Sequence, residues 1–228
     1  LSMQFQTSDE WNLIRHVLAE YYGSRGGEKA GLMTEVACLV WNAVTRRRES
    51  RRTVEPHIVA VIEFRGVKCE LPEDYSHIWG REFELEEGKA LTHFEELLRG
   101  WARDADLKRL GEALDAFARR NKTSYLWTVL MEIGAEFPAT LGEMLEPALN
   151  ETTFVAHPDY SYGGVALFGA LHAHGNPERR AGLEQLLLEL PAKDEKTGAG
   201  EPGHSWAERS QNRLLAVLQE PNLVTDRV

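Results

Sequence analysis

A short pattern occurs twice in the C-terminal half of the chain: a Ser-Tyr pair, an apolar helical stretch, a turn with proline, and a second apolar stretch. The first copy begins at Ser124-Tyr125 and turns at Phe137-Pro138, and the second begins at Ser161-Tyr162 and turns at Asn176-Pro177. The copies are offset by about 37 to 41 residues, which is within the period of helical-hairpin repeats. A single hairpin cannot bury its apolar face alone, so the pattern predicts stacked hairpins that present a surface to other molecules.

Helical periodicity extends well beyond the repeated segment. Apolar residues at helical spacing, together with capping and breaking residues, predict a series of helices at residues 8–22, 29–48, 89–101, 105–120, 124–135, 138–149, 162–174, 177–190 and 205–219. Most connections between them are short. The connection at 192–203 carries charged residues, glycine and proline without a large apolar residue, and it is predicted to be a mobile surface loop.

The period changes between residues 58 and 71. Ile62 to Arg65 and Val67 to Leu71 alternate apolar and polar residues on either side of Gly66. This period of two favours a short strand pair or a bulged extended segment. A helix over 57–64 is the alternative, because 58–62 is apolar on every side. The acidic stretch that follows, 73–88, contains Trp79 and is predicted to be a loop whose aromatic side chains fold back onto the core.

Composition narrows the class of protein. Of the 228 residues, 43% are hydrophobic and 27% are charged, as in ordinary globular domains. The net charge of −10 argues against broad attraction to nucleic acid or to an anionic membrane. No apolar run is long enough to span a bilayer. Cys38 and Cys69 lack metal-binding spacing and are predicted to be buried, reduced thiols of a cytoplasmic protein.

The repeated hairpins resemble HEAT-like and armadillo-type helical repeats over about residues 89–219, in period, proline placement and apolar spacing. The Asp and the Arg or Lys that HEAT units carry at fixed places are not consistently present. The segment is also similar to the helical-repeat tails of large bacterial multidomain proteins built around a nucleotide-binding switch domain, whose phosphate-binding motif does not occur here. The resemblance implies an α-solenoid that acts as a scaffold or sensor portion.

Arginine is concentrated at the predicted end of the second helix. Five guanidinium groups fall within seven positions, at Arg46, Arg47, Arg48, Arg51 and Arg52. Cations at a helix C-terminus complement the helix dipole. Arginine also forms bidentate bonds with phosphates and with acidic protein surfaces. The cluster is therefore a candidate binding site, and the acidic stretch 82–87 is a candidate partner within the chain.

Aromatic residues supply further candidates for binding. Tyr160 and Tyr162 lie at the start of the second repeat, and Trp79 lies in the acidic stretch. Aromatic and arginine side chains contribute most of the binding energy at protein interfaces. The alternative is that these rings pack between neighbouring hairpins. Gly163-Gly164 predicts a close backbone approach at this point, to the next helix or to a partner.

The sequence predicts no catalytic, cofactor-binding or metal-binding residue. His172 and His174 fall near the end of a predicted helix, where residues two apart are separated by about 200° around the axis and do not easily share a metal ion. We interpret them as capping and surface histidines. Ser76-His77 lacks the glycine framework of a nucleophile elbow, and Gly163-Gly164 fits neither the dinucleotide nor the phosphate-loop pattern.

Together these patterns predict a mainly α protein. Residues 1–88 form an N-terminal helical subdomain with a short β element, and residues 89–228 form a HEAT-like helical array. The expected function is a noncatalytic scaffold or sensor segment that binds another protein or the remainder of a longer parent chain. Two alternatives stay open: an enzyme with its site between the subdomain and the array, and a nucleic-acid adaptor that uses the arginines of 46–52.

Overall fold

The computed structural model describes residues 29–49, 57–76, 86–194, 206–218 and 223–224. Helices make up most of this part of the chain, which confirms the mainly α class, and two strands form a small antiparallel sheet. The elements are, in chain order, α2 (Ala30–Glu49), β1 (His57–Phe64), β2 (Val67–Glu73), α4 (Glu86–Arg103), α5 (Leu107–Arg120), α6 (Ser124–Glu136), the π-helical turn η3 (Pro138–Gly142), α7 (Glu143–Leu145), the 3₁₀ helix η4 (Glu146–Asn150), α8 (Thr153–Ala156), α9 (Pro158–His174), α10 (Pro177–Asp194) and α11 (Trp206–Val217).

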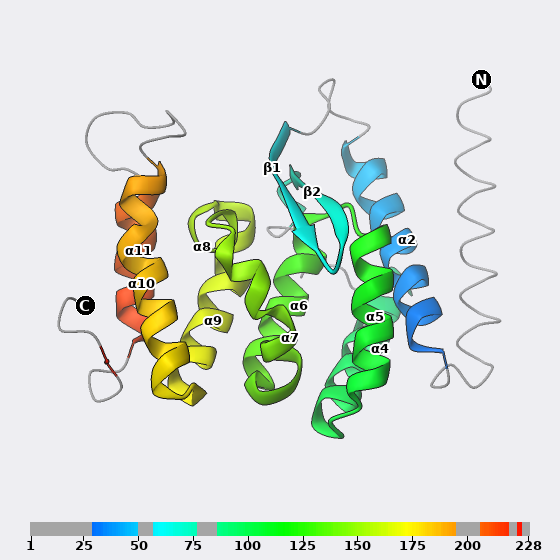
Figure 1. The fold of residues 1–228 in the computed structure, drawn as a ribbon. Coiled ribbons are helices and arrows are strands. Elements are labelled where there is room, and N and C mark those ends of the chain that lie inside the picture. The colour runs from blue at the N-terminus through cyan, green and yellow to red at the C-terminus, as the bar shows by residue number, and fades with distance from the viewer. Residues whose placement is uncertain (1–28, 50–56, 77–85, 195–205, 219–222, 225–228) are drawn as a thin grey trace.

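The longer helices stand side by side, with α2, α4 and α5 at one end of the molecule and α10 and α11 at the other (Figure 1). In direct contact, α2 packs on α5, α6 packs on α9, and α10 packs on both α9 and α11. The β hairpin lies near the upper ends of α5 and α6 in this view, where β2 contacts both helices and β1 contacts η4. The hairpin is thus a small sheet set against a helical body.

The prediction of two strands is confirmed, and the alternative of a helix over 57–64 is wrong. Arg65 and Gly66 form the turn with φ of 53° and 73°, and two consecutive positive values are the geometry of a type I′ hairpin turn. The register pairs Phe64 with Val67 and Ile62 with Cys69. These four side chains face the helical body, because a strand alternates its side chains between two faces.

The predicted helix over 138–149 is wrong in detail. In its place the chain forms a π-helical turn, three α-helical residues and a 3₁₀ helix. Pro147 lies within the predicted segment and lacks the N–H that an α-helical interior needs. Gly142 passes so close to α6 that an added Cβ would lie 2.7 Å from the backbone oxygen of Gly134.

The predicted helix at 8–22 lies outside the described residues, as does the 192–203 loop beyond Asp194.

An aromatic cluster joins the hairpin to the helices. The Trp127 ring on α6 lies 5.3 Å from that of Phe64 on β1, 4.8 Å from that of Phe117 on α5 and 5.0 Å from that of Phe154 on α8, measured between centroids. Trp127 is 1% exposed. Eight leucine and isoleucine residues of the two repeats are buried as well: Leu130, Ile133, Leu141, Leu145, Leu167, Leu171, Leu186 and Leu187.

Two glycines allow α9 to approach its neighbours closely. A Cβ on Gly163 would lie 2.6 Å from the Thr128 backbone oxygen of α6, and one on Gly164 would lie 1.8 Å from the Phe154 backbone oxygen of α8. Real Cβ atoms do not occur at such distances from backbone oxygens. The close approach expected at Gly163-Gly164 is therefore confirmed, and it is made to neighbouring helices.

We expect Gly164→Ala to destabilise the protein by at least about 3 kcal/mol, because the added methyl group meets immobile backbone. The matched control is Gly182→Ala in α10, where an added Cβ meets nothing within 4 Å. That change removes a flexible residue from a helix and is expected to stabilise by about 0.5–1 kcal/mol. Urea unfolding measures both. Shifts of the two variants in the same direction would contradict the packing described here.

Candidate interaction surface

The structure scatters the binding residues predicted from sequence. Arg46 is exposed near the end of α2, and Arg47 and Arg48 belong to the same helix. Tyr160 is fully buried and donates its hydroxyl hydrogen to the Pro72 backbone oxygen at 2.7 Å, so it cannot contact a partner in this structure. Tyr162 is 63% exposed on α9. The remaining three predicted residues lie outside the described ranges: Arg51, Arg52 and Trp79.

His172 is not the surface histidine that the sequence suggested. It is 1% exposed, and its Nε2 lies 2.9 Å from Oε1 of the fully buried Glu184. The same carboxylate oxygen accepts the Val224 backbone N–H at 2.9 Å, so the pair attaches a C-terminal segment to α10. His174 is exposed. Among the described residues, no group of three or more His, Cys, Asp or Glu side chains is arranged to hold a metal ion.

A buried carboxylate holds the end of the hairpin. Asp74 directly follows β2, is 2% exposed, and accepts four hydrogen bonds from two serines. The Ser76 N–H and hydroxyl donate at 2.9 and 2.7 Å, the Ser124 N–H donates at 3.0 Å, and the Ser124 hydroxyl supplies the fourth bond. Ser124 is the first residue of α6. Asp74 therefore joins the end of β2 to the start of α6.

A second buried carboxylate holds the same segment from α9. Oδ2 of Asp159, in the first turn of α9, accepts the backbone N–H groups of Asp74 and Tyr75 at 3.0 and 3.1 Å. Tyr160 adds its bond to Pro72. Burial raises the pKa of the Tyr160 hydroxyl, and the charges of Asp74 and Asp159 raise it further, so this group stays protonated and donates. We call the group of Asp74, Ser76, Ser124, Asp159 and Tyr160 the carboxylate clamp.

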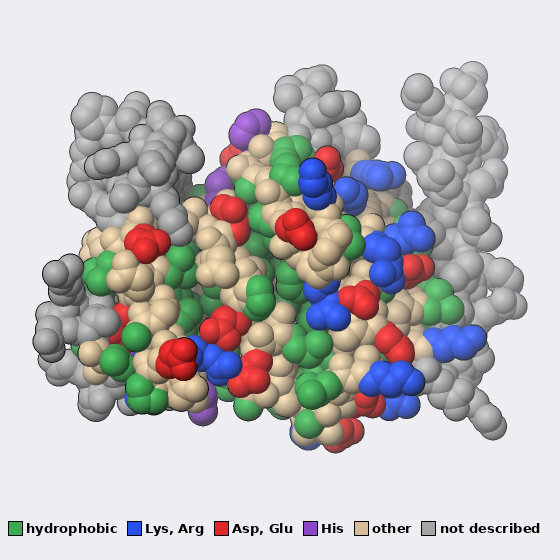
Figure 2. All heavy atoms as spheres, viewed as in Figure 1, with side chains coloured by type: hydrophobic (Ala, Val, Ile, Leu, Met, Phe, Trp, Pro, Cys, Tyr) green, Lys and Arg blue, Asp and Glu red, His purple; other side chains and the backbone are tan. Residues whose placement is uncertain are grey.

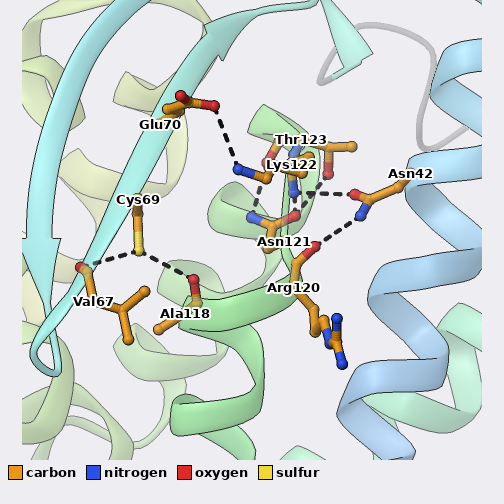
Figure 3. Close-up of polar contacts among 9 residues, drawn as sticks. All are labelled: Asn42, Val67, Cys69, Glu70, Ala118, Arg120, Asn121, Lys122 and Thr123. Carbon is orange, nitrogen blue, oxygen red and sulfur yellow. Dashed lines mark hydrogen bonds and ion pairs between the residues drawn. The ribbon is translucent and has the colours of Figure 1, made fainter.

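A separate set of contacts holds β2 beside the end of α5 (Figure 3). The Cys69 thiol donates to the Ala118 backbone oxygen at 3.3 Å, and Lys122 Nζ lies 3.3 Å from a Glu70 carboxylate oxygen. Asn42 of α2 donates to the Arg120 oxygen at 2.7 Å and accepts from the Lys122 N–H at 3.0 Å. Burial raises the pKa of the Cys69 thiol and so keeps its proton in place. These contacts hold β2 beside the end of α5, and Asn42 joins that end to α2.

On the side away from β2, the contacts of β1 within the described residues include η4. In a hairpin with a two-residue turn, residues that exchange backbone hydrogen bonds alternate with residues whose N–H and C=O point away from the partner strand. The backbone N–H and C=O groups of Phe64 and Ile62 therefore point toward β2. Those of Glu63 and Val61 point away from it. Within the described part of the chain, no hydrogen bond joins these outward groups to another segment.

The side chains of this edge are apolar and partly exposed. Val61 is 57% exposed and Ile58 is 41% exposed, and the run 58–62 carries no charge and no proline. Figure 2 shows hydrophobic side chains at the surface over the hairpin. The sequence contains this uncharged run rich in β-branched residues, and the run by itself predicts only a strand. A free edge depends on what lies beside the strand, which periodicity does not report.

Basic side chains gather on the neighbouring face over α2 and α5, with acidic side chains between them (Figure 2). Three cations that lie beside or at the end of α5 have carboxylate partners: Arg65 pairs with Asp115, Arg120 with Glu35 at 3.5 Å, and Lys122 with Glu70 at 3.3 Å. Much of the positive charge on this face is therefore neutralised within the molecule.

A polar cleft of about 520 Å³ lies between η4 and α10. Its apolar floor includes Leu149, Leu183 and Leu186, which are buried. Arg179 in its wall forms ion pairs with Glu143 at 3.0 Å and with Glu146 at 3.1 Å. These pairs hold the start of α10 to α7 and to the start of η4.

No protein-family model, no curated protein and no solved structure matches the chain. No helix of the described residues is long and apolar enough to cross a membrane.

We expect Asp74→Ala to cost about 3–5 kcal/mol, because it leaves the N–H groups of Ser76 and Ser124 buried without their acceptor. Glu73→Ala is the neighbouring control. The Glu73 carboxylate accepts only an exposed bond from the Tyr75 hydroxyl and lies 3.9 Å from His57, so its loss is expected to cost less than about 1 kcal/mol. Chemical denaturation compares the two. Equal losses would mean that the clamp does not hold the hairpin.

Asp74 also makes stability depend on pH in a defined direction. Burial raises its pKa above the ordinary value of 3.8, and the four serine hydrogen bonds lower it only in part. The folded protein therefore keeps this proton to a higher pH than the unfolded chain, so the stabilisation is largest below pH 3.8 and falls as the pH rises through the folded pKa. Asp74→Asn does not titrate. We expect the unfolding free energy of the protein minus that of this variant to decrease as the pH rises, and an increase would show that the hydrogen bonds outweigh burial.

Proposed function

We propose that this chain is a noncatalytic interaction module that binds an extended segment of another protein as an additional strand at the edge of β1. The observation that carries the proposal is the uncharged run 58–62, in which Val61 is 57% exposed and its outward backbone groups have no hydrogen-bond partner among the described residues. Natural proteins usually protect such an edge with charge, proline or a covering segment, because it is a template for pairing with another chain. The outward-facing residues of β2, Lys68 and Glu70, are charged, whereas the run 58–62 of β1 is not, and among the described residues no hydrogen bond joins the outward backbone groups of Val61 and Glu63 to another segment.

Strand addition draws its affinity from backbone hydrogen bonds and its specificity from alternate side chains. The outward N–H and C=O groups of Val61 and Glu63 supply the backbone hydrogen bonds. The exposed side chains of Ile58 and Val61 supply apolar contact. Binding to a rigid edge loses less entropy than binding to a flexible one. The carboxylate clamp and the α5 contacts support a rigid hairpin, because the clamp holds the end of β2 and the α5 contacts hold β2 along its length.

The buried polar groups favour a positional role over a catalytic one. Asp74, Ser76 and Ser124 combine acid and hydroxyl groups as a hydrolase would, but each is at most 2% exposed and all are hydrogen-bonded to one another. Carboxylates within the basic face weaken its attraction for a nucleic-acid backbone.

We further infer that α6 and α9 are equivalent helices of a HEAT-like array in a cytoplasmic scaffold. Three observations support this: α6 packs directly on α9, α9 contacts α10 and α11 in turn, and both thiols are unbridged. The irregular segment from η3 to η4 stands where the second helix of the first repeat belongs, and it is a departure from that pattern.

Capture of a protein partner from native-host lysate, with the bait at nanomolar concentration, tests the interaction. Val61→Lys adds a charge at the centre of the edge and is expected to abolish capture of a partner that the unmodified chain retains. Leu107→Lys on α5 is the matched control, because Leu107 is also 57% exposed but lies away from β1. Hydrogen exchange on the captured complex is expected to show protection of the Val61 and Glu63 amides. A partner held equally by all three proteins would contradict binding at this edge.

A further inference from the structure

We propose that the cleft between η4 and α10 binds a small organic cation, an amine or a guanidine that carries an apolar body. The volume of the cleft is about 520 Å³. Pockets that bind small molecules commonly measure about 300–1,000 Å³ and combine an apolar lining with a few polar groups. None of the described residues that line the cleft belongs to β1, so this proposal is independent of strand addition at that edge.

Gly182 is the residue that points most directly to a ligand. It lies in the second turn of α10, is exposed, and lines the cleft. Glycine destabilises a helix interior relative to alanine. An added Cβ at Gly182 would meet nothing within 4 Å, so packing does not require a glycine at this position. The missing side chain leaves the backbone of α10 open to the cleft, and such an opening permits the close approach of a ligand.

The floor of the cleft determines what the body of the ligand must be. Leu149 of η4 and Leu183 and Leu186 of α10 form this floor. A polar group placed against hydrocarbon loses its hydrogen bonds to water without gaining others, which is unfavourable. The part of the ligand that lies on the leucines is therefore apolar.

The walls of the cleft carry more negative than positive charge. Arg179 forms ion pairs with Glu143 at 3.0 Å and with Glu146 at 3.1 Å. Glu178 is exposed and lines the cleft, and no ion pair holds it within the described part of the chain. Three carboxylates thus surround one guanidinium, an excess of two negative charges. The start of α10 contributes only about half a positive charge, so a cation is favoured over an anion.

The carboxylates can accept further hydrogen bonds without losing those to Arg179. An ionised carboxylate offers about four lone-pair positions, and the ion pair with Arg179 at 3.1 Å leaves others of Glu146 available. The amide of Asn176 is partly used, because its oxygen accepts the Arg179 backbone N–H at 2.9 Å. An ammonium or guanidinium group, which only donates hydrogen bonds, matches walls that are rich in acceptors.

Three related compounds test the proposal on the full chain labelled with ¹⁵N: tryptamine, a cation with an indole body, tryptophol, its neutral counterpart, and indole-3-acetate, an anion. We expect tryptamine to bind with a Kd of about 0.1–1 mM and to shift the NMR signals of the Gly182 amide and of the Asn150 and Asn176 side-chain amides. Tryptophol is expected to bind at least about threefold more weakly, because it lacks the charge. Indole-3-acetate is expected not to bind at about 10 mM.

Two variants locate the site. Gly182→Leu fills the cleft and is expected to weaken tryptamine binding at least about tenfold. Its matched control is Gly100→Leu on α4, where an added Cβ also meets nothing within 4 Å and binding is expected to be unchanged. Glu178→Gln is expected to weaken the binding of tryptamine about two- to fivefold and to leave that of tryptophol unchanged. Circular dichroism confirms that each variant is folded.

Two results would overturn the cleft as the site: no tryptamine binding at about 10 mM, or tryptamine binding that Gly182→Leu leaves unchanged. Tighter binding of indole-3-acetate than of tryptamine would overturn the choice of a cation.

Discussion

The position of the hairpin depends on one buried carboxylate. Asp74 gathers four hydrogen bonds at the point where β2 ends and α6 begins, and Asp159 receives the backbone of the same segment from α9. Two carboxylates at 1–2% exposure are expensive to desolvate, and apolar side chains would fill the same space at lower cost. Hydrogen bonds to specific N–H groups are directional, so they allow only one placement of the chain. Apolar contacts of similar volume would determine that placement less closely.

That placement gives the two strands of the small sheet different neighbours, because β2 contacts α5 and α6 and β1 contacts η4. The Cys69 thiol and the Lys122–Glu70 pair hold β2 to α5, while Asn42 holds the end of α5 to α2. The two strands also differ in charge, because Lys68 and Glu70 of β2 point outward while the run 58–62 of β1 is uncharged. The aromatic contacts of Trp127 with Phe64 fix the inner face, so the hairpin presents β1 as a rigid element of a helical protein.

Periodicity predicted most helices because each buries a stripe of apolar residues at helical spacing. It failed over 138–149, where apolar spacing continues but the chain forms a π-helical turn, a short α-helical segment and a 3₁₀ helix that contains Pro147. The repeated Ser-Tyr pair was less equivalent than it looked. Ser124 begins α6, whereas Ser161 lies one turn inside α9, and Tyr125 is buried while Tyr162 is exposed. The clamp was beyond prediction, because it joins residues 74, 124 and 159 through the tertiary fold.

An exposed apolar edge is normally a hazard for a protein, and here the distribution of charge determines what the edge can do. The net charge of −10 keeps copies apart at long range, and at physiological ionic strength this repulsion is screened beyond about 8 Å. Contact is then decided by the few side chains that meet. Glu63 at the end of the uncharged run admits an apolar or basic residue opposite it and disfavours an acidic one. In the strand addition proposed above, an edge that is neutral over 58–62 and charged at Glu63 would constrain the register of the added strand, and the irregularity between Ile58 and Ala60 bends β1 at the other end of that run.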